Sequence, residues 1–77
     1  MGKDATPYAE PVKRLEPVEA LRVLDLLRRL EDRTFLEPDG ERVAGLVFRW
    51  RHQVRRGTIR CADVPVMAAE LARWGVS

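Results

Sequence analysis

Arginine is concentrated in one segment of this chain, from Arg42 to Ala62, which also contains the only histidine and no acidic residue. A guanidinium group offers several N–H donors in one plane, so it binds phosphates and carboxylates well. The chain has 14 Lys and Arg against 12 Asp and Glu; the six arginines of the segment give it a charge of +6 and leave the remainder at −4. This separation predicts a surface that attracts phosphates or an acidic protein.

An aromatic residue, Phe48, is placed at the centre of this segment by helical geometry. If residues advance by about 100° each, the apolar residues of the segment fall within about 60° of one line; they are Val43, Leu46, Val47, Trp50 and Val54. Arginines flank the line on both sides, with Arg42, Arg49 and Arg56 on one side and Arg51 and Arg55 on the other. Phe48 then points outward among Arg51, His52 and Arg55.

An exposed aromatic ring among guanidinium groups is suited to stack on a nucleobase or to anchor a protein interface. The predicted binding residues are therefore Arg42, Phe48, Arg49, Arg51, His52, Arg55, Arg56 and Arg60. The competing interpretation is that Phe48 packs against another part of the chain or against a second copy, while the arginines form a solvated face.

No group of residues predicts catalysis or the binding of a cofactor, metal or small-molecule substrate. A catalytic histidine needs an orienting group and a nucleophile nearby, and His52 has neither in the sequence pattern. One histidine and one cysteine cannot form a structural zinc site within one chain. We therefore expect the protein not to be an enzyme, and we expect Cys61 to be a small buried apolar residue.

Cysteine usage and hydropathy indicate a cytoplasmic protein. A single cysteine excludes an intramolecular disulfide, which fits a reducing compartment. The first 14 residues are polar and contain Pro7 and Pro11, so they lack the apolar stretch of a signal peptide. The chain also has no apolar run of about 18 residues, so we expect it not to span a membrane.

Three helices are predicted to position these residues, after an N-terminal arm over residues 1–16. The arm has no periodicity, although Tyr8 and Val12 could attach it to the body. The first helix begins at Pro17, a residue suited to the first helical position, and runs to about Arg33. Its apolar residues recur every three or four positions; they are Val18, Leu21, Val23, Leu24, Leu26, Leu27 and Leu30.

Two structures compete for the region around Pro38-Asp39-Gly40. In the first, Asp39 caps a second helix that reaches Arg56 and stops at Gly57. In the second, residues 33–37 and 41–47 form a short β-hairpin around this turn. The helical spacing of the apolar residues continues for three turns, which favours the helix.

A short, extended connection over residues 57–61 is predicted to lead into the third helix. This helix begins at Asp63 or Val64, has Pro65 in its first turn and ends at Gly75. Its predicted inward residues are Met67, Ala68, Leu71 and Trp74. The expected fold is thus all-α: a small three-helix domain over residues 17–77 with a flexible N-terminal arm.

Two functions from different classes fit this domain. The first is a protein-interaction module, such as a regulator, inhibitor or assembly factor. It would dock its arginine-rich surface centred on Phe48, or its leucine-rich first helix, onto a protein partner or a second copy. The second is a nucleic-acid-binding accessory protein that uses residues Arg49 to Arg60 on phosphates. The modest net charge of +2 and the small core of so short a chain favour the first function.

Overall fold

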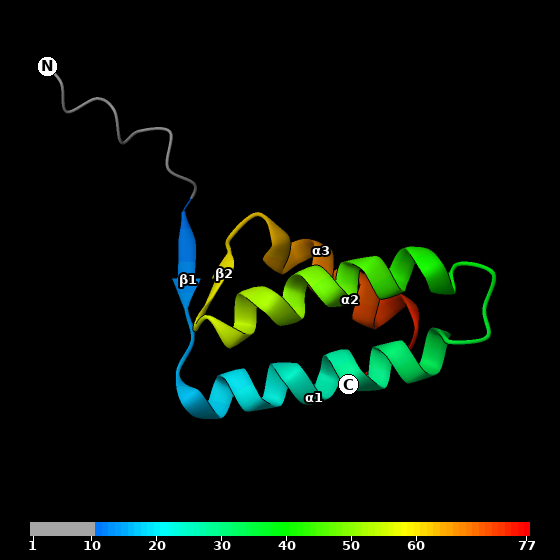
Figure 1. Ribbon diagram of the computed structural model, residues 1–77, viewed down its shortest axis with the longest axis horizontal. Coiled ribbons are helices and arrows are strands. Elements are labelled where there is room, and N and C mark those ends of the chain that lie inside the picture. The colour runs from blue at the N-terminus through cyan, green and yellow to red at the C-terminus, as the bar shows by residue number, and fades with distance from the viewer. Residues whose placement is uncertain (1–10) are drawn as a thin grey trace, which may run out of the picture.

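The protein is described here by a computed structural model, which defines residues 11–77 (Figure 1). The elements follow in the order β1 (Val12–Arg14), α1 (Pro17–Thr34), α2 (Gly40–Arg55), β2 (Thr58–Arg60) and α3 (Asp63–Arg73). The predicted all-α, three-helix fold is confirmed. Within the described range, no helix combines the length and the apolar character needed to cross a membrane.

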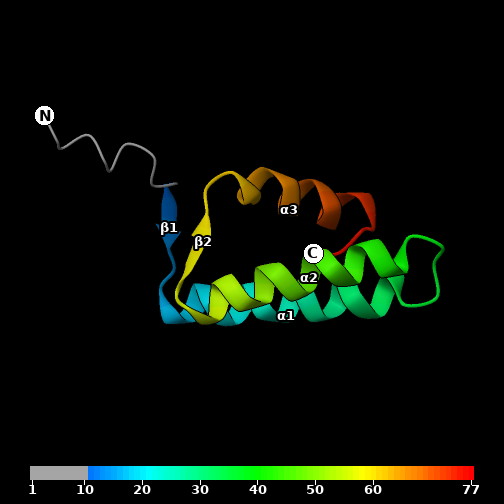
Figure 2. The same ribbon diagram turned by 45° about the horizontal axis from the view of Figure 1, so that its top comes forward.

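Helices α1 and α2 form an antiparallel pair, and α3 lies along one side of this pair (Figures 1 and 2). Pro17 occupies the start of α1, as the sequence predicts. The core is built from Leu27 and Leu30 of α1 and from Val43, Val47, Trp50 and Val54 of α2, all at most 2% exposed. Ile59 of β2 and Met67 of α3 complete this buried apolar cluster. Every one of these side chains is apolar, so their burial supplies the main stabilising free energy.

The turn between α1 and α2 depends on Gly40. A Cβ atom at this position would overlap the carbonyl oxygen of Thr34. Because α2 begins at Gly40, the alternative β-hairpin around Pro38-Asp39-Gly40 is wrong. Asp39 stands at the N-cap position, but its side chain makes no capping hydrogen bond; the carboxylate instead accepts hydrogen bonds from Arg42 and Arg73.

A small two-stranded sheet closes the opposite end of the helical pair. Gly57 ends α2 with a φ of 85°, a left-handed conformation that glycine adopts without strain. The chain then forms β2, which pairs antiparallel with β1 in the register Val12↔Arg60 and Arg14↔Thr58. Residues 12–14 were predicted to belong to the arm, but they form β1. Three residues are too short for a periodic pattern, and the partner strand lies far along the sequence. Tyr8 lies outside the described residues.

Helix α3 packs through a stripe that is only partly the predicted one. Met67 is 7% exposed, and Leu71 and Trp74 are partly buried, whereas Ala68 is exposed. Two acidic residues, Asp63 and Glu70, are buried instead, at 6% and 9% exposure. Cys61 was expected to be buried but is exposed, because it follows β2 at the edge of the molecule rather than lying on a core-facing position.

Candidate functional site

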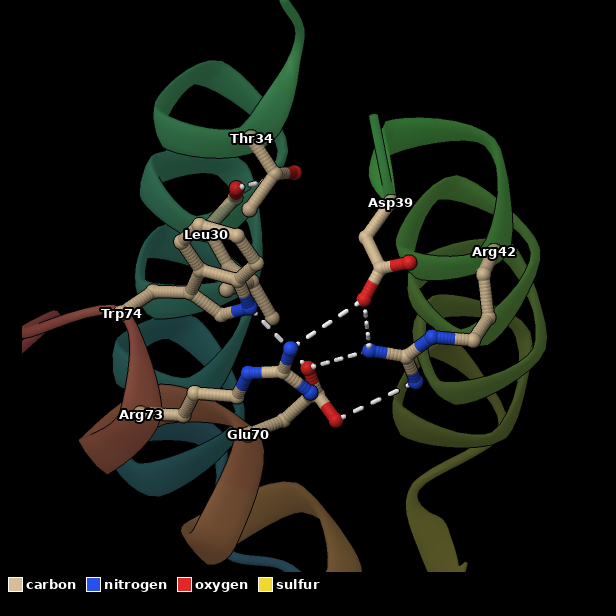
Figure 3. Close-up of polar contacts among 7 residues, drawn as sticks. All are labelled: Leu30, Thr34, Asp39, Arg42, Glu70, Arg73 and Trp74. Atoms are coloured by element: carbon tan, nitrogen blue, oxygen red, sulfur yellow. Dashed lines mark hydrogen bonds and ion pairs between the residues drawn. The ribbon is translucent and has the colours of Figure 1, made fainter. Parts of the chain in front are cut away.

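The arginines of α2 do not all face solvent as free cations, because α3 supplies carboxylates to one flank. Arg42 Nη1 and Nη2 donate to Glu70 Oε2 and Oε1 at 3.3 and 3.0 Å. Trp74 Nε1 also donates to Glu70 Oε1, at 3.0 Å. Figure 3 shows Glu70 between these two donors, with Arg73 reaching Asp39 across the same cluster. Arg42 therefore joins α3 to the start of α2.

The electrostatics of this cluster agree with its geometry. The hydrogen bonds from Arg42 are the main reason that the pKa of Glu70 is lowered from its ordinary value of 4.5, although burial acts in the opposite direction. The same hydrogen bonds raise the pKa of Arg42. Trp74 is flanked by two guanidinium groups, with Arg33 at 5.7 Å and Arg73 at 5.3 Å from the ring centroid. These contacts hold the C-terminal end of α3 against the rest of the domain.

A second group of polar contacts between elements lies near the start of α3. Asp63 accepts from Gln53 Nε2 at 3.0 Å and from Arg49 Nη2 at 3.5 Å. Gln53 Oε1 also accepts the backbone N–H of Arg60 at 2.8 Å, so one side chain links α2, β2 and α3. Arg49 follows Arg42 by seven residues, and Glu70 follows Asp63 by seven. The Arg42–Glu70 and Arg49–Asp63 pairs therefore lie two helical turns apart along the antiparallel α2 and α3.

The other flank of α2 faces α1. Arg51 Nη2 donates to Glu31 Oε1 at 2.9 Å, across the two helices. An open groove of about 480 Å³ runs along this line and is lined by residues of α1 and α2 only. Both charge signs line it, because Asp25, Glu31 and Asp32 lie beside Arg28, Arg51 and Arg55. The groove is therefore not a uniformly positive track.

Most of the remaining predicted residues lie on the outward side of α2, from its middle to its C-terminal end. Phe48 is 72% exposed, and it lines a shallow hollow with Arg51, His52 and Arg55. The side chains of His52, Arg55 and Arg56 are exposed and contact no hydrogen-bonding or ionic partner within residues 11–77. Arg60 lies apart from them, half-buried on β2.

Two residues that the sequence interpretation left out complete this surface. Glu41 and Gly45 precede Phe48 by seven and three residues, so all three lie on one side of α2. We call the set the outer strip; it comprises Glu41, Gly45, Phe48, His52 and Arg55. Glu41 could have been found from its spacing of seven residues to Phe48, which equals the spacing from Phe48 to Arg55.

Gly45 is unusual on this strip because the fold gives no reason for it. It lies inside α2, where glycine is less favourable than alanine by about 1 kcal/mol. A Cβ atom at Gly45 would meet no other atom within 4 Å. The missing side chain therefore leaves the helix backbone open to close approach from outside the chain.

The site offers contacts rather than reactive groups. It presents one large aromatic ring, an exposed backbone at Gly45, a carboxylate at one end and guanidinium groups at the other. Within residues 11–77, no three histidine, cysteine or acidic side chains come together as metal ligands would. Comparison of the chain with protein-family models, with curated proteins and with solved structures finds no match.

Proposed function

We propose that this protein is a protein-interaction module that docks a partner on the outer strip of α2. The observation that carries the proposal is the exposure of Phe48, a residue that is 72% exposed in the middle of a helix. Aromatic anchors of this kind contribute disproportionately to binding free energy when a partner covers them. The open backbone at Gly45 lies one turn away, so a partner helix could pack closely beside the ring.

The internal ion pairs also support docking of a protein. Within the segment, Arg42, Arg49 and Arg51 have carboxylate partners in the domain. Their charges are largely offset, so they contribute less positive potential than the sequence predicts. What remains is a mixed surface with an aromatic centre. Such a surface resembles the anchor and polar rim of a protein interface more than a phosphate track.

Photo-crosslinking tests this proposal. Phe48 is replaced in full-length protein by the photoreactive analogue p-benzoylphenylalanine, which keeps an aromatic ring at the centre of the strip. The matched control places the same analogue at Val66, which is 45% exposed on α3. We expect a specific crosslinked protein product from position 48, whether with another protein or with a second copy. Equal product at both positions, or none at position 48, would contradict docking on the strip.

A second candidate function is nucleic-acid binding. One observation favours it: Arg55 and Arg56 are exposed, adjacent and without an ionic partner among residues 11–77. Two phosphate contacts would give a shallow dependence of log K on log salt, with a slope of about −1.8 on duplex DNA. Changing both residues to alanine should flatten that slope. Absence of any binding at about 50 mM salt would remove this candidate.

A further inference from the structure

The outer strip carries charged residues that are spaced symmetrically on either side of Phe48. Glu41 lies seven residues before Phe48, and Arg55 lies seven residues after it. Seven residues make about two helical turns, or about 10.5 Å, so the three side chains share one side of α2. An acidic group and a basic group thus stand at equal distances on either side of one exposed aromatic ring.

From this arrangement we infer that the occupant of the outer strip is a second copy of the same chain, packed with its α2 antiparallel to the first. The inference rests on the proposed docking function and names its partner. A two-fold axis at Phe48 places Glu41 opposite Arg55 of the second copy, and the reverse contact follows by symmetry. The charges of the strip are then complementary at both ends.

The alternative parallel arrangement is unfavourable on the same grounds. It would set Glu41 against the second copy's equivalent carboxylate and Arg55 against its equivalent guanidinium group. Like charges in contact oppose association. Charge complementarity therefore selects the antiparallel pair over the parallel one.

Two further features fit an antiparallel pair of α2 helices. Near the axis, the missing Cβ of Gly45 lets the second helix approach closely. Beside Phe48, the hollow of about 120 Å³ lined by Arg51, His52 and Arg55 can receive the opposing ring. Neither Glu41 nor Arg55 is held by an ionic partner within residues 11–77, so both are available for the contact.

Charge reversal tests the inference in solution. Full-length wild type, Glu41→Arg, Arg55→Glu and the double variant are compared by sedimentation equilibrium from micromolar to millimolar concentration. Circular dichroism of each verifies that the helices are retained. We expect wild type to dimerise, and each single variant to weaken the dimer by about 10- to 30-fold, because two contacts become repulsive. The double variant should return to within about threefold of wild type, because both contacts are attractive again.

The possible outcomes separate this inference from the proposed function. A wild-type chain that remains monomeric throughout the range overturns the second-copy inference. A dimer that neither single variant weakens, or that the double variant fails to restore, overturns the antiparallel contact. If the chain is monomeric but position 48 still crosslinks to another protein, docking on the strip stands and only the identity of the partner is wrong.

Discussion

Replacing Gly45 with alanine is expected to stabilise the folded chain while it weakens docking. The new methyl group meets no atom within 4 Å, so it introduces no clash within the domain. The free energy of unfolding of the monomer should therefore rise by the difference in helix propensity, which favours alanine by about 0.5–1 kcal/mol at an interior position. For a domain of this size, that gain raises Tm by about 2–8 °C. The same methyl group stands where a second helix would approach, so the dimer should dissociate more readily.

Two measurements on Gly45→Ala are needed because the expected effects have opposite signs. Thermal unfolding is followed by circular dichroism at a concentration low enough for the chain to be monomeric, since dimerisation itself raises Tm. Sedimentation equilibrium then gives the dimer dissociation constant. Gly40→Ala is the matched control, because its Cβ would overlap the Thr34 carbonyl oxygen. That variant should be destabilised by about 1–3 kcal/mol.

Either of two results would show that Gly45 does not provide a site of close approach for a second helix. A lower Tm in the alanine variant would show that the position is constrained within the domain. A higher Tm with an unchanged dissociation constant would show that no second backbone comes close to Gly45.

Three further predictions concern the fold. Leu27→Ala removes a fully buried side chain and should cost about 2–5 kcal/mol in urea unfolding, against under about 1 kcal/mol for the exposed Leu21→Ala. Gln53→Ala removes hydrogen bonds to Asp63 and to the backbone of Arg60. We expect the free energy of unfolding to fall by about 2 kcal/mol, and a fall of less than about 0.5 kcal/mol would show that these hydrogen bonds do not stabilise the fold. Because the folded pKa of Glu70 is lowered, its contribution to stability is present above pH 4.5 and is lost as the pH falls through that lowered pKa. In Glu70→Gln this part of the pH dependence of urea unfolding should disappear, and an unchanged pH profile would contradict the role of the carboxylate.

The helices could be predicted from the sequence because their signals are local. Pro17 marks the start of α1, Gly57 marks the end of α2, and the apolar residues between them recur at helical spacing. The burial of Val43, Val47, Trp50 and Val54 follows from the same spacing. The outward position of Phe48 follows as well, because a residue about 140° from the buried line points away from the core.

The charge distribution could not be predicted in the same way, because it depends on contacts between distant residues. The arginines on both sides of the buried line were predicted to bind a partner, yet Arg42 and Arg49 contact Glu70 and Asp63 of α3. The equal spacing of seven residues in both pairs is the one local sign of this match. Strand β1 was missed for a related reason, since its hydrogen-bonding partner is β2, at the far end of α2.

In the inferred dimer, two copies pack through the outer strip with their α2 helices antiparallel and Phe48 at the two-fold axis. The chain's single cysteine, Cys61, is exposed and lies beyond the C-terminal end of α2, so a nitroxide label there reports the arrangement without a substitution. Pulsed dipolar spectroscopy should give one defined distance longer than about 20 Å, because the labels lie at opposite ends of the pair. Phe48→Ala should abolish the dipolar signal, whereas Val66→Ala should retain it. Absence of a dipolar signal in the wild type, or a distance that persists in Phe48→Ala, would contradict this packing of two copies.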